Sequence, residues 1–415
     1  MEVMRDAAIT INPKRLHESF LVSAGIGTLP NGGLSRLALS DADKVMRDTF
    51  VRWLEEAGLA VRVDDFGNIY GRREGKDKEA AAILIGSHLD TQPQGGKYDG
   101  IIGVLSALEV VRTLNDHGIE TLRPIEIVNF TNEEGARFEP PMLGSGGVAQ
   151  IFEEEFVWSR EDREGIRFGD ELKRIGYAGE KANRAKNIHR YVELHIEQGP
   201  VLEHEGISVA AVEGIQGMTW LEVKLKGQVD HAGPTPMSMR KDALVAAAKM
   251  ITAIQQTAKE IDETATTTVG RISVLPGVVN CVPGEVVFSV DIRHFDDGLR
   301  EKMIEIIREK ISTIAAVEQV EIEIKTLWDI RSTQFSQEIV ELVLEAASRY
   351  GYSARKMVSG AGHDAKYMND IVPSGMIFVP SVGGKSHCEE EYTHWEDVVK
   401  GANVLLHVVR SLADK

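Results

Sequence analysis

Cysteine is scarce in this chain: Cys281 and Cys388 are the only two among 415 residues. Two cysteines so far apart provide neither a disulfide framework nor a paired-cysteine metal motif. The N-terminal stretch also lacks the uninterrupted apolar core of a secretion signal. Both absences are typical of a protein from a reducing compartment, and we expect a cytoplasmic location.

Positive charge is also in deficit. Lysine and arginine number 47 against 64 aspartates and glutamates, which gives a net charge of −17. Such a chain is repelled by nucleic-acid phosphates and by anionic lipid surfaces. No apolar run reaches the length of about 18 residues that a membrane-spanning helix needs. We therefore expect neither nucleic acid nor a membrane among the partners.

At 415 residues the chain is too long for one ordinary hydrophobic core, which predicts two domains. Apolar spacing predicts a helix at residues 46–60, followed by a strand at 80–88, a helix at 100–118 and a strand at 125–135. The order strand, helix, strand predicts a mostly parallel sheet with right-handed crossovers. Helix and strand patterns alternate again after about residue 332.

The middle of the chain has a different pattern. Between residues 214 and 330 the apolar periodicity predicts the order β-α-β-β-α-β, with one of its strands at 266–275. This is the split βαβ (ferredoxin-like) arrangement. We therefore predict an α/β fold in which a larger domain, residues 1–213 and 331–415, is interrupted by a smaller domain, residues 214–330.

The stretch GSHLDTQPQGGKYDG, residues 86–100, ends a buried strand with chemically active side chains. His88 and Asp90 share one face of an extended strand. A Gly-rich turn then brings Asp99 toward the same place. Asp90 is better placed to orient the His88 imidazole than to bind a metal itself. Because open α/β sheets bind ligands outside the carboxyl ends of their strands, this strand end is a candidate site.

Glu133, Glu134 and His195 also fall at predicted strand ends, and His387 lies in a late loop. Three histidines and several carboxylates suit a metal of borderline softness, usually zinc. Neighbouring glutamates point in different directions, so one can bind metal while the other acts as general base on the attacking water. Together these residues predict a hydrolytic metal site.

Each of these motifs also has a plainer interpretation. A strand-end histidine or a Glu-Glu pair is more often simply solvated, and the three glutamates at 389–391 have the composition of a solvated acidic run. His363 could cap a helix or lie in the core. Arg293 could form a surface ion pair with Asp291 instead of binding a substrate.

Several motifs occur in the order in which one enzyme family has them. They are GSHLDTQPQGGKYDG, NFTNEEGARF, ELHIEQGP, DHAGPTPM, VNCVPGEVVFSVDIRH, SGAGHDA and SGMIFVPS. From about residue 50 to the C-terminus, the chain resembles the N-carbamoyl-amino-acid amidohydrolases, and its motifs are similar to those of the β-ureidopropionase (β-alanine synthase) subgroup. That family belongs to the di-metal aminoacylase and carboxypeptidase clan. The resemblance therefore implies a di-metal exopeptidase-like larger domain.

The resemblance also implies a metal centre and a substrate site. It implies two divalent ions, with zinc as the expected metal and manganese, cobalt or nickel as alternatives. One ion would be held by His88, Asp99 and His195, and the other by Asp99, Glu134 and His387. Glu133 would be the general base. The implied substrate-binding residues are Gln198, His231, Asn280, Arg293 and His363.

One position departs from the family pattern. The family commonly has asparagine after the metal-binding histidine of the late loop, whereas this chain has Cys388 after His387. The substitution bears on the hydrogen bonding around His387.

The implied reaction is the hydrolysis of an N-carbamoyl amino acid to the amino acid, carbon dioxide and ammonia. The substrate would be N-carbamoyl-β-alanine or an N-carbamoyl-L-α-amino acid. His231 would donate to the oxyanion, and Arg293 would bind the substrate carboxylate. The resemblance further implies a homodimer through the inserted domain, which also acts as a lid, with His231 and Asn280 reaching the partner's site.

Three alternatives remain open from the sequence. Allantoate amidohydrolase shares nearly all of these motifs, and an aminoacylase or dipeptidase belongs to the same clan. A non-catalytic scaffold could keep the fold without the reaction. The intact set of ligands and base argues against a scaffold, because drift would remove some of these residues.

Overall fold

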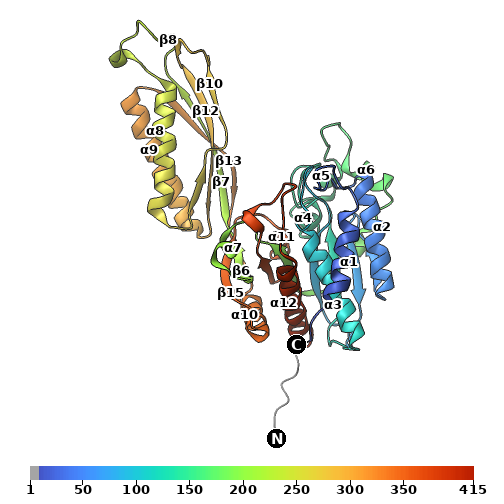
Figure 1. Cartoon of the computed structure of the whole chain (residues 1–415). Coiled ribbons are helices and arrows are strands. Elements are labelled where there is room, and N and C mark those ends of the chain that lie inside the picture. The colour runs from blue at the N-terminus through green and yellow to red at the C-terminus, as the bar shows by residue number, and fades with distance from the viewer. Residues whose placement is uncertain (1–8) are drawn as a thin grey trace. The chain divides into compact units, whose positions relative to one another are not determined.

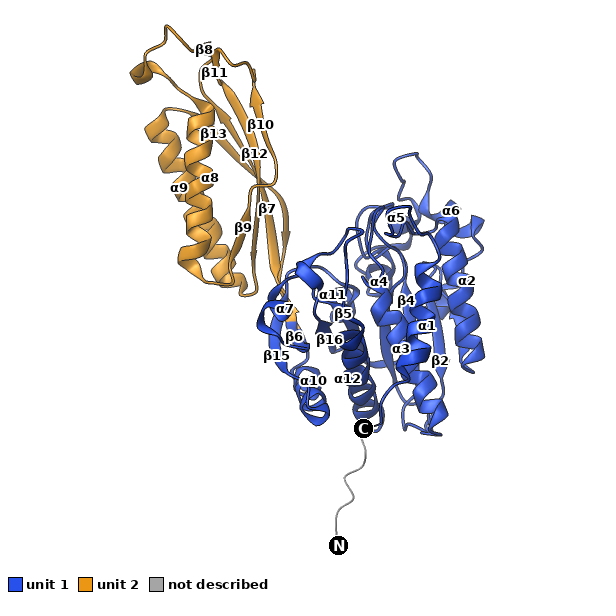
Figure 2. Cartoon of the chain, in the orientation of Figure 1, with its two compact units in different colours: residues 1–213, 335–415 blue, residues 214–334 orange. Residues whose placement is uncertain are grey.

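The computed structural model describes residues 9–415 of the chain (Figure 1). These residues form two compact units (Figure 2). The larger unit contains the chain up to Glu213 together with residues 335–415, and the smaller unit is Gly214–Gln334. The smaller unit therefore ends at residue 334, where the sequence pattern predicts an end at residue 330.

A mixed sheet of nine strands has the order β1-β2-β4-β3-β5-β16-β6-β14, with β15 beside β6. All of it lies in the larger unit except β14 and the last two residues of β6, which fall within the range of the smaller unit. The inner strands β4, β3, β5 and β16 are parallel to one another, whereas β1, β2 and β6 pair antiparallel with their neighbours. The predicted α/β class with a mostly parallel sheet is thus confirmed. The strands are β1 Ala60–Val63, β2 Ile69–Arg73, β3 Ala82–His88, β4 Ile125–Phe130, β5 Ile188–Ile196, β6 Val209–Ile215, β14 Thr333–Gln334, β15 Ala354–Ser359 and β16 Ser374–Val379.

Helices cover this sheet. Helix α3 packs on β3 and β5, α12 packs on β16 and β5, and α2 packs on β1 and β2. The helices of the larger unit are α1 Pro13–Ala24, α2 Asp41–Glu56, α3 Ile101–Asp116, α4 Leu143–Val148, α5 Glu154–Trp158, α6 Phe168–Arg174, α7 Val201–Glu205, α10 Gln337–Tyr350, α11 Asp364–Met368 and α12 Trp395–Ala413, with short 3-10 turns at Lys181–Asn183 and Val382–Gly384.

The N-terminal elements differ from the prediction in their bounds. The helix predicted at 46–60 runs from Asp41 to Glu56 because the Ser40 side chain caps it by accepting the Asp43 N–H at 3.2 Å. Residues 60–63 then form the edge strand β1, which pairs with β2. The sequence pattern predicts neither β1 nor β2, since both are short. β1 is the edge strand and has no buried residue, whereas β2 lies between β1 and β4 and has three buried residues.

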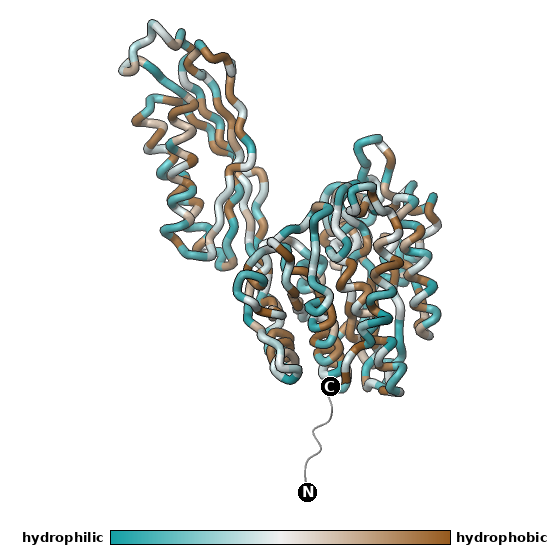
Figure 3. The backbone as a smooth tube through the Cα atoms, viewed as in Figure 1, coloured by the Kyte–Doolittle hydropathy of each residue, from teal (hydrophilic) through white to brown (hydrophobic). Residues whose placement is uncertain are grey.

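The smaller unit has an antiparallel sheet in the order β10-β12-β7-β13, with β9 also paired to β12. The first strand β7 lies between β12 and β13, as in the split βαβ arrangement. Hydrophobic and hydrophilic residues alternate along α8 and α9 (Figure 3), whose apolar sides join the sheet in one core. The elements are β7 Gly217–Lys226, β8 Asp230–His231, α8 Ala243–Ile261, β9 Thr266–Thr268, β10 Ile272–Leu275, β11 Cys281–Val282, β12 Glu285–His294, α9 Asp297–Glu318 and β13 Glu321–Ile330, with a 3-10 turn at Met237–Met239.

The strand predicted at 266–275 is divided into β9 and β10, and both parts pair with β12. Within residues 9–415, no helix combines the length and the apolar content that crossing a membrane requires.

Candidate metal centre

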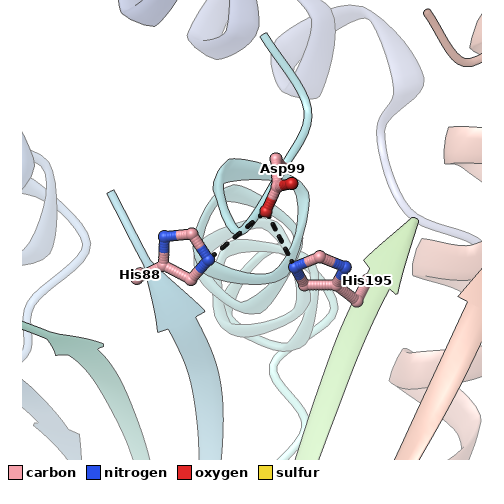
Figure 4. Close-up of side chains that lie close together, drawn as sticks. All are labelled: His88, Asp99 and His195. Carbon is pink, nitrogen blue, oxygen red and sulfur yellow. Dashed lines mark ion pairs between the residues drawn. The ribbon is translucent and has the colours of Figure 1, made fainter. Parts of the chain in front are cut away.

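The carboxyl ends of two neighbouring parallel strands bring His88 and His195 together. His88 is the last residue of β3, and His195 lies one residue before the end of β5. Asp99 enters between them from the turn that precedes α3 (Figure 4). This is the strand edge at which the sequence predicts the site.

The first ligand set consists of His88, Asp99 and His195. Asp99 Oδ1 lies 3.5 Å from His88 Nε2 and 3.2 Å from His195 Nε2, and all three residues are buried. Within the described part of the chain, His88 Nε2 makes no hydrogen bond although it is buried. A buried imidazole nitrogen without such a partner, facing a carboxylate, fits a divalent ion as its missing partner.

Main-chain carbonyls fix the orientation of both imidazoles. His88 Nδ1 lies 3.0 Å from the Asp90 carbonyl oxygen, and His195 Nδ1 lies 2.9 Å from the Ile196 carbonyl oxygen. In each ring the Nδ1–H therefore donates to a carbonyl, which leaves Nε2 as the atom that can bind a metal. The Nε2 of His195 accepts the Gly100 main-chain N–H at 3.1 Å, so a metal ion would have to replace or share this contact.

The Asp90 side chain has a different role from the one that its spacing to His88 predicts. Its two carboxylate oxygens accept the main-chain N–H groups of Glu133 and Glu134, each at 3.3 Å. The contact that orients His88 comes from the Asp90 main chain instead. The Asp90 carboxylate thus positions the turn that carries the two glutamates.

The second ligand set consists of Asp99, Glu134 and His387. His387 Nε2 lies 3.5 Å from Asp99 Oδ2 and 3.5 Å from Glu134 Oε2. Asp99 therefore belongs to both sets, with one oxygen directed to each. The two sets differ in exposure, because the His387 side chain is 51% exposed while its two partners are buried.

Two side-chain amides donate into the second set. Gln198 Nε2 lies 2.7 Å from Asp99 Oδ2 and 3.3 Å from His387 Nε2. Gln92 Nε2 lies 2.7 Å from Glu134 Oε2. The two amide N–H groups thus place partial positive charge beside the carboxylates of Asp99 and Glu134.

Glu133 lies beside the first ligand set, with Oε2 3.6 Å from His88 Nε2. Burial raises the pKa of the Glu133 carboxyl well above its usual value, the charges of Asp364 and Glu134 raise it further, and His88 opposes them. Burial likewise raises the pKa of Glu134, and the charge of Asp99 adds to the effect. Buried carboxylates that repel one another in this way are stabilised by a cation, which is a second reason why divalent ions fit here.

For the two histidines of the first set, neighbouring charges outweigh the effect of burial on the pKa. Burial alone would lower the pKa of the His88 imidazole, but the charges of Glu133 and Asp99 hold it well above the usual value. For His195, the charge and hydrogen bond of Asp99 likewise outweigh burial and raise the pKa. Burial would raise the pKa of Asp99, yet His195 and His88 hold it well below its usual value.

His363 lies in the core beside the first set. It occupies the N-cap position of α11, is 1% exposed, and packs edge-on against His195 with ring centroids 4.5 Å apart. Its Nε2 lies 3.0 Å from Ser359 Oγ. The side chain makes no capping hydrogen bond, so its contacts are those of the core histidine that the sequence left as an alternative, and the substrate-binding role stays a prediction.

The remaining predicted residues belong to the smaller unit. His231 in β8 is opposite Cys281 in β11, and the Ala232 N–H donates to the Asn280 carbonyl oxygen at 2.9 Å, so His231 and Asn280 lie together. Both residues are exposed. The Gly233 N–H donates to His231 Nδ1 at 3.1 Å, so a neutral His231 ring has its own proton on Nε2.

Arg293 lies on β12 and pairs with Asp291 two residues earlier. Its Nη2 is 2.8 Å from Asp291 Oδ2 and its Nε is 3.0 Å from Asp291 Oδ1. The ion pair that the sequence offered as the plainer interpretation is therefore formed. A bidentate pair also fixes the plane of the guanidinium, so the predicted substrate role is compatible with it.

The sequence interpretation missed several buried carboxylates near the site, among them Glu193, Asp364 and Glu391. Glu193 accepts hydrogen bonds from Ser87 Oγ at 2.6 Å and from Tyr191 Oη at 3.1 Å. Its spacing of two residues from His195 on one strand was a usable signal, because such residues share a face. Glu391 is 4% exposed, which contradicts the interpretation of residues 389–391 as a solvated run. No sequence signal separated it from Glu389 and Glu390.

Comparisons with known proteins show the family to which the chain belongs. Residues 84–411 match the family described as peptidase family M20/M25/M40. The N-carbamoyl-L-amino-acid amidohydrolase of Rhizobium meliloti is 44% identical over 404 residues, covering 97% of each chain. Allantoate deiminase 1 of Glycine max is 34% identical, covering 99% of this chain and 90% of that protein. An amidase of the hydantoinase/carbamoylase family from Burkholderia multivorans superimposes with a TM-score of 0.95 at 46% identity, covering 98% of this chain and 99% of that one.

Proposed function

We propose, from the premise that this chain belongs to peptidase family M20/M25/M40 and to its N-carbamoyl-amino-acid amidohydrolases, that it is a di-metal enzyme for N-carbamoyl-L-α-amino acids. The products are the amino acid, carbon dioxide and ammonia. The observation on which the proposal depends is that Asp99 directs one oxygen to each of two ligand sets. We propose the L-α substrate rather than N-carbamoyl-β-alanine because the relative from Rhizobium meliloti is named an N-carbamoyl-L-amino-acid amidohydrolase.

The first ion is assigned to His88, Asp99 and His195, and the second to Asp99, Glu134 and His387. The chemistry that such ions supply when bound is Lewis-acid polarisation of the ureido carbonyl and acidification of the attacking water. Imidazole and carboxylate donors make zinc the expected metal, with manganese, cobalt and nickel as alternatives.

Glu133 is the proposed general base. Its carboxyl is buried and lies beside His88 without belonging to either ligand set. Its raised pKa favours holding a proton between two steps. Glu133 takes the proton from the attacking water and then delivers it to the nitrogen that leaves as ammonia.

The smaller unit supplies the proposed substrate contacts. The exposed Nε2–H of His231 donates to the oxyanion that develops on the carbonyl oxygen. Arg293, fixed by Asp291, binds the substrate carboxylate. Asn280 lies beside His231 and contributes a further amide contact. Gln198 and His363 complete the proposed substrate set.

A homodimer through the smaller unit is part of the proposal, as is a lid role for that unit. Strand β10 is the edge of its sheet, and Ile272 and Leu275 on it are 47% and 57% exposed. Apolar side chains on an edge strand are usually covered by a partner. We also propose a cytoplasmic location, because the chain has only two cysteines.

A side-by-side assay tests the function. Ammonia release is measured from N-carbamoyl-L-methionine, N-carbamoyl-β-alanine and allantoate, first with metal-free protein and then with added zinc, manganese, cobalt or nickel. The proposal predicts activity only with metal and fastest release from the L-α substrate. Full activity in metal-free protein would contradict the di-metal mechanism.

Allantoate amidohydrolase is the second candidate. A relative named allantoate deiminase matches 99% of this chain at 34% identity. The same assay separates the two candidates, since the preferred substrate would then be allantoate.

A further inference from the structure

The loop after β16 contains three consecutive glutamates, and only the last of them is buried. Glu389 and Glu390 are exposed, and Glu390 forms an ion pair with Lys385. Glu391 is 4% exposed. A carboxylate is costly to bury unless hydrogen-bond donors surround it, so the surroundings of Glu391 indicate its role.

The polar groups around Glu391 come from the turn that carries Asp99 and from the loop that carries His387. Glu391 Oε1 accepts the main-chain N–H groups of Tyr98 and Asp99, each at 3.0 Å. Glu391 Oε2 lies 3.1 Å from Ser386 Oγ, which also lies 2.8 Å from Asp99 Oδ2. The Ser386 hydroxyl has one proton and can donate it to only one of these carboxylates at a time, so Ser386 is a neighbour that Glu391 shares with the ligand Asp99. Ser386 also directly precedes His387.

The turn before Asp99 is shaped to admit this carboxylate. A Cβ at Gly96 would overlap the Glu391 side chain, so only glycine leaves room there. The Tyr98 ring packs against Phe20 of α1 and against Tyr392, with ring centroids 5.7 Å and 5.8 Å apart. The Glu391 side chain is therefore enclosed between the turn that precedes Asp99 and its own loop.

We propose that Glu391 is a positioning residue that holds Asp99 and the His387 loop in the arrangement the second ligand set needs. The inference rests on the proposed function, because it concerns the metal affinity of that set. Glu391 touches neither the substrate nor a ligand atom of His387. It acts through the main chain of Asp99 and through the hydroxyl of Ser386.

The two ligand sets depend on this contact unequally. His88 on β3 is paired with Phe130 of β4 and His195 on β5 with Phe378 of β16, so strand pairing fixes both residues independently of the late loop. His387 is on a loop outside the sheet, its side chain is exposed, and its backbone has a φ of 57°. No strand pairing fixes its position, which therefore depends on contacts with neighbouring loop residues. Losing Glu391 should therefore weaken the second set more than the first, because the second set loses support at both Asp99 and the His387 loop, whereas the first is affected at Asp99 alone.

The test is a calorimetric titration in which cobalt(II) is added to metal-free full-length protein. Wild type should bind two ions. Glu391→Ala should weaken the second binding event by roughly 10-fold or more and leave the first within about 3-fold, as for other residues that orient metal ligands. Ser386→Ala should shift the second event in the same direction by a smaller factor.

Glu390→Ala is the matched control, because Glu390 is the adjacent exposed glutamate, and it should change neither event. Circular dichroism checks the fold of each variant. Equal weakening of both events, or no weakening of either, would overturn the inference. If Glu391→Ala does not fold, Glu391→Gln, which keeps the size of the side chain and replaces one acceptor oxygen by an amide, decides by whether it weakens the second event more than the first. Wild-type protein that binds fewer than two ions would instead contradict the proposed function, and the inference with it.

Discussion

Gly100 faces the imidazole of His88 so closely that a Cβ at this position would overlap the ring. Its φ of 65° is also in the region that favours glycine. The final glycine of the motif GSHLDTQPQGGKYDG is therefore explained by the space that the metal-ligand ring occupies.

This contact gives the first prediction. Gly100→Ala should displace His88 or the Asp99 turn and lower the metal content of purified protein, measured by elemental analysis. Gly118→Ala is the matched control, since Gly118 has a φ of 60° and no atom within 4 Å of a built Cβ. Both variants have the same backbone strain of about 1 kcal/mol. Equal metal loss in the two would mean that strain, not the ring contact, is responsible.

The second prediction separates the roles of the adjacent glutamates. Glu133→Gln should retain two metal ions and lose at least about 100-fold in turnover, because it removes the general base alone. Glu134→Gln should lose affinity for the second ion, because Glu134 belongs to the second ligand set. Metal analysis and steady-state kinetics on both variants test this. The reverse pattern, with metal lost from Glu133→Gln, would exchange the two assignments.

The third prediction concerns pH and follows from the raised pKa values of His88 and His195. In the metal-free protein both imidazoles keep their protons to a higher pH than usual, and a metal ligand must be deprotonated. Metal binding near neutral pH should therefore release protons, and metal affinity should rise as the pH rises through these pKa values. Calorimetry in two buffers with different heats of ionisation measures the release. Identical heats in both buffers would contradict it.

Much of this site was accessible from the sequence because strand ends, side-chain alternation and residue type agree there. His88 and His195 end parallel strands, and their faces follow from the period of two. The Asp90 carboxylate was assigned to the wrong partner, because main-chain N–H groups more than 40 residues later compete for it. Glu391 was missed because its burial depends on Gly96, some 300 residues earlier. Tertiary contacts of this kind leave no local pattern.

The fourth prediction concerns the proposed carboxylate anchor. Arg293→Lys keeps the positive charge but loses the bidentate fork, so KM for the preferred carbamoyl amino acid should rise roughly 10-fold or more. Turnover at saturation should change less. Asp291→Asn tests whether the ion pair itself matters, because it removes the charge of Asp291 while leaving that of Arg293. An unchanged KM in Arg293→Lys for every substrate would assign Arg293 to the ion pair alone.

The last prediction tests whether His231 acts in the partner's site of the proposed homodimer. Glu133→Gln and His231→Ala are each expected to be inactive, and the two are refolded or exchanged together. If His231 acts across the dimer, each mixed dimer contains one intact site with Glu133 from one subunit and His231 from the other.

Random pairing of equal amounts makes half of the dimers mixed, and each mixed dimer has one working site of two, so about a quarter of wild-type activity should return. Differently tagged subunits show by affinity capture that mixed dimers form. If His231 acts within its own subunit, every site keeps one defect and mixing restores nothing. Mixed dimers without activity would therefore assign His231 to its own subunit, and the dimer would not be needed to complete the site.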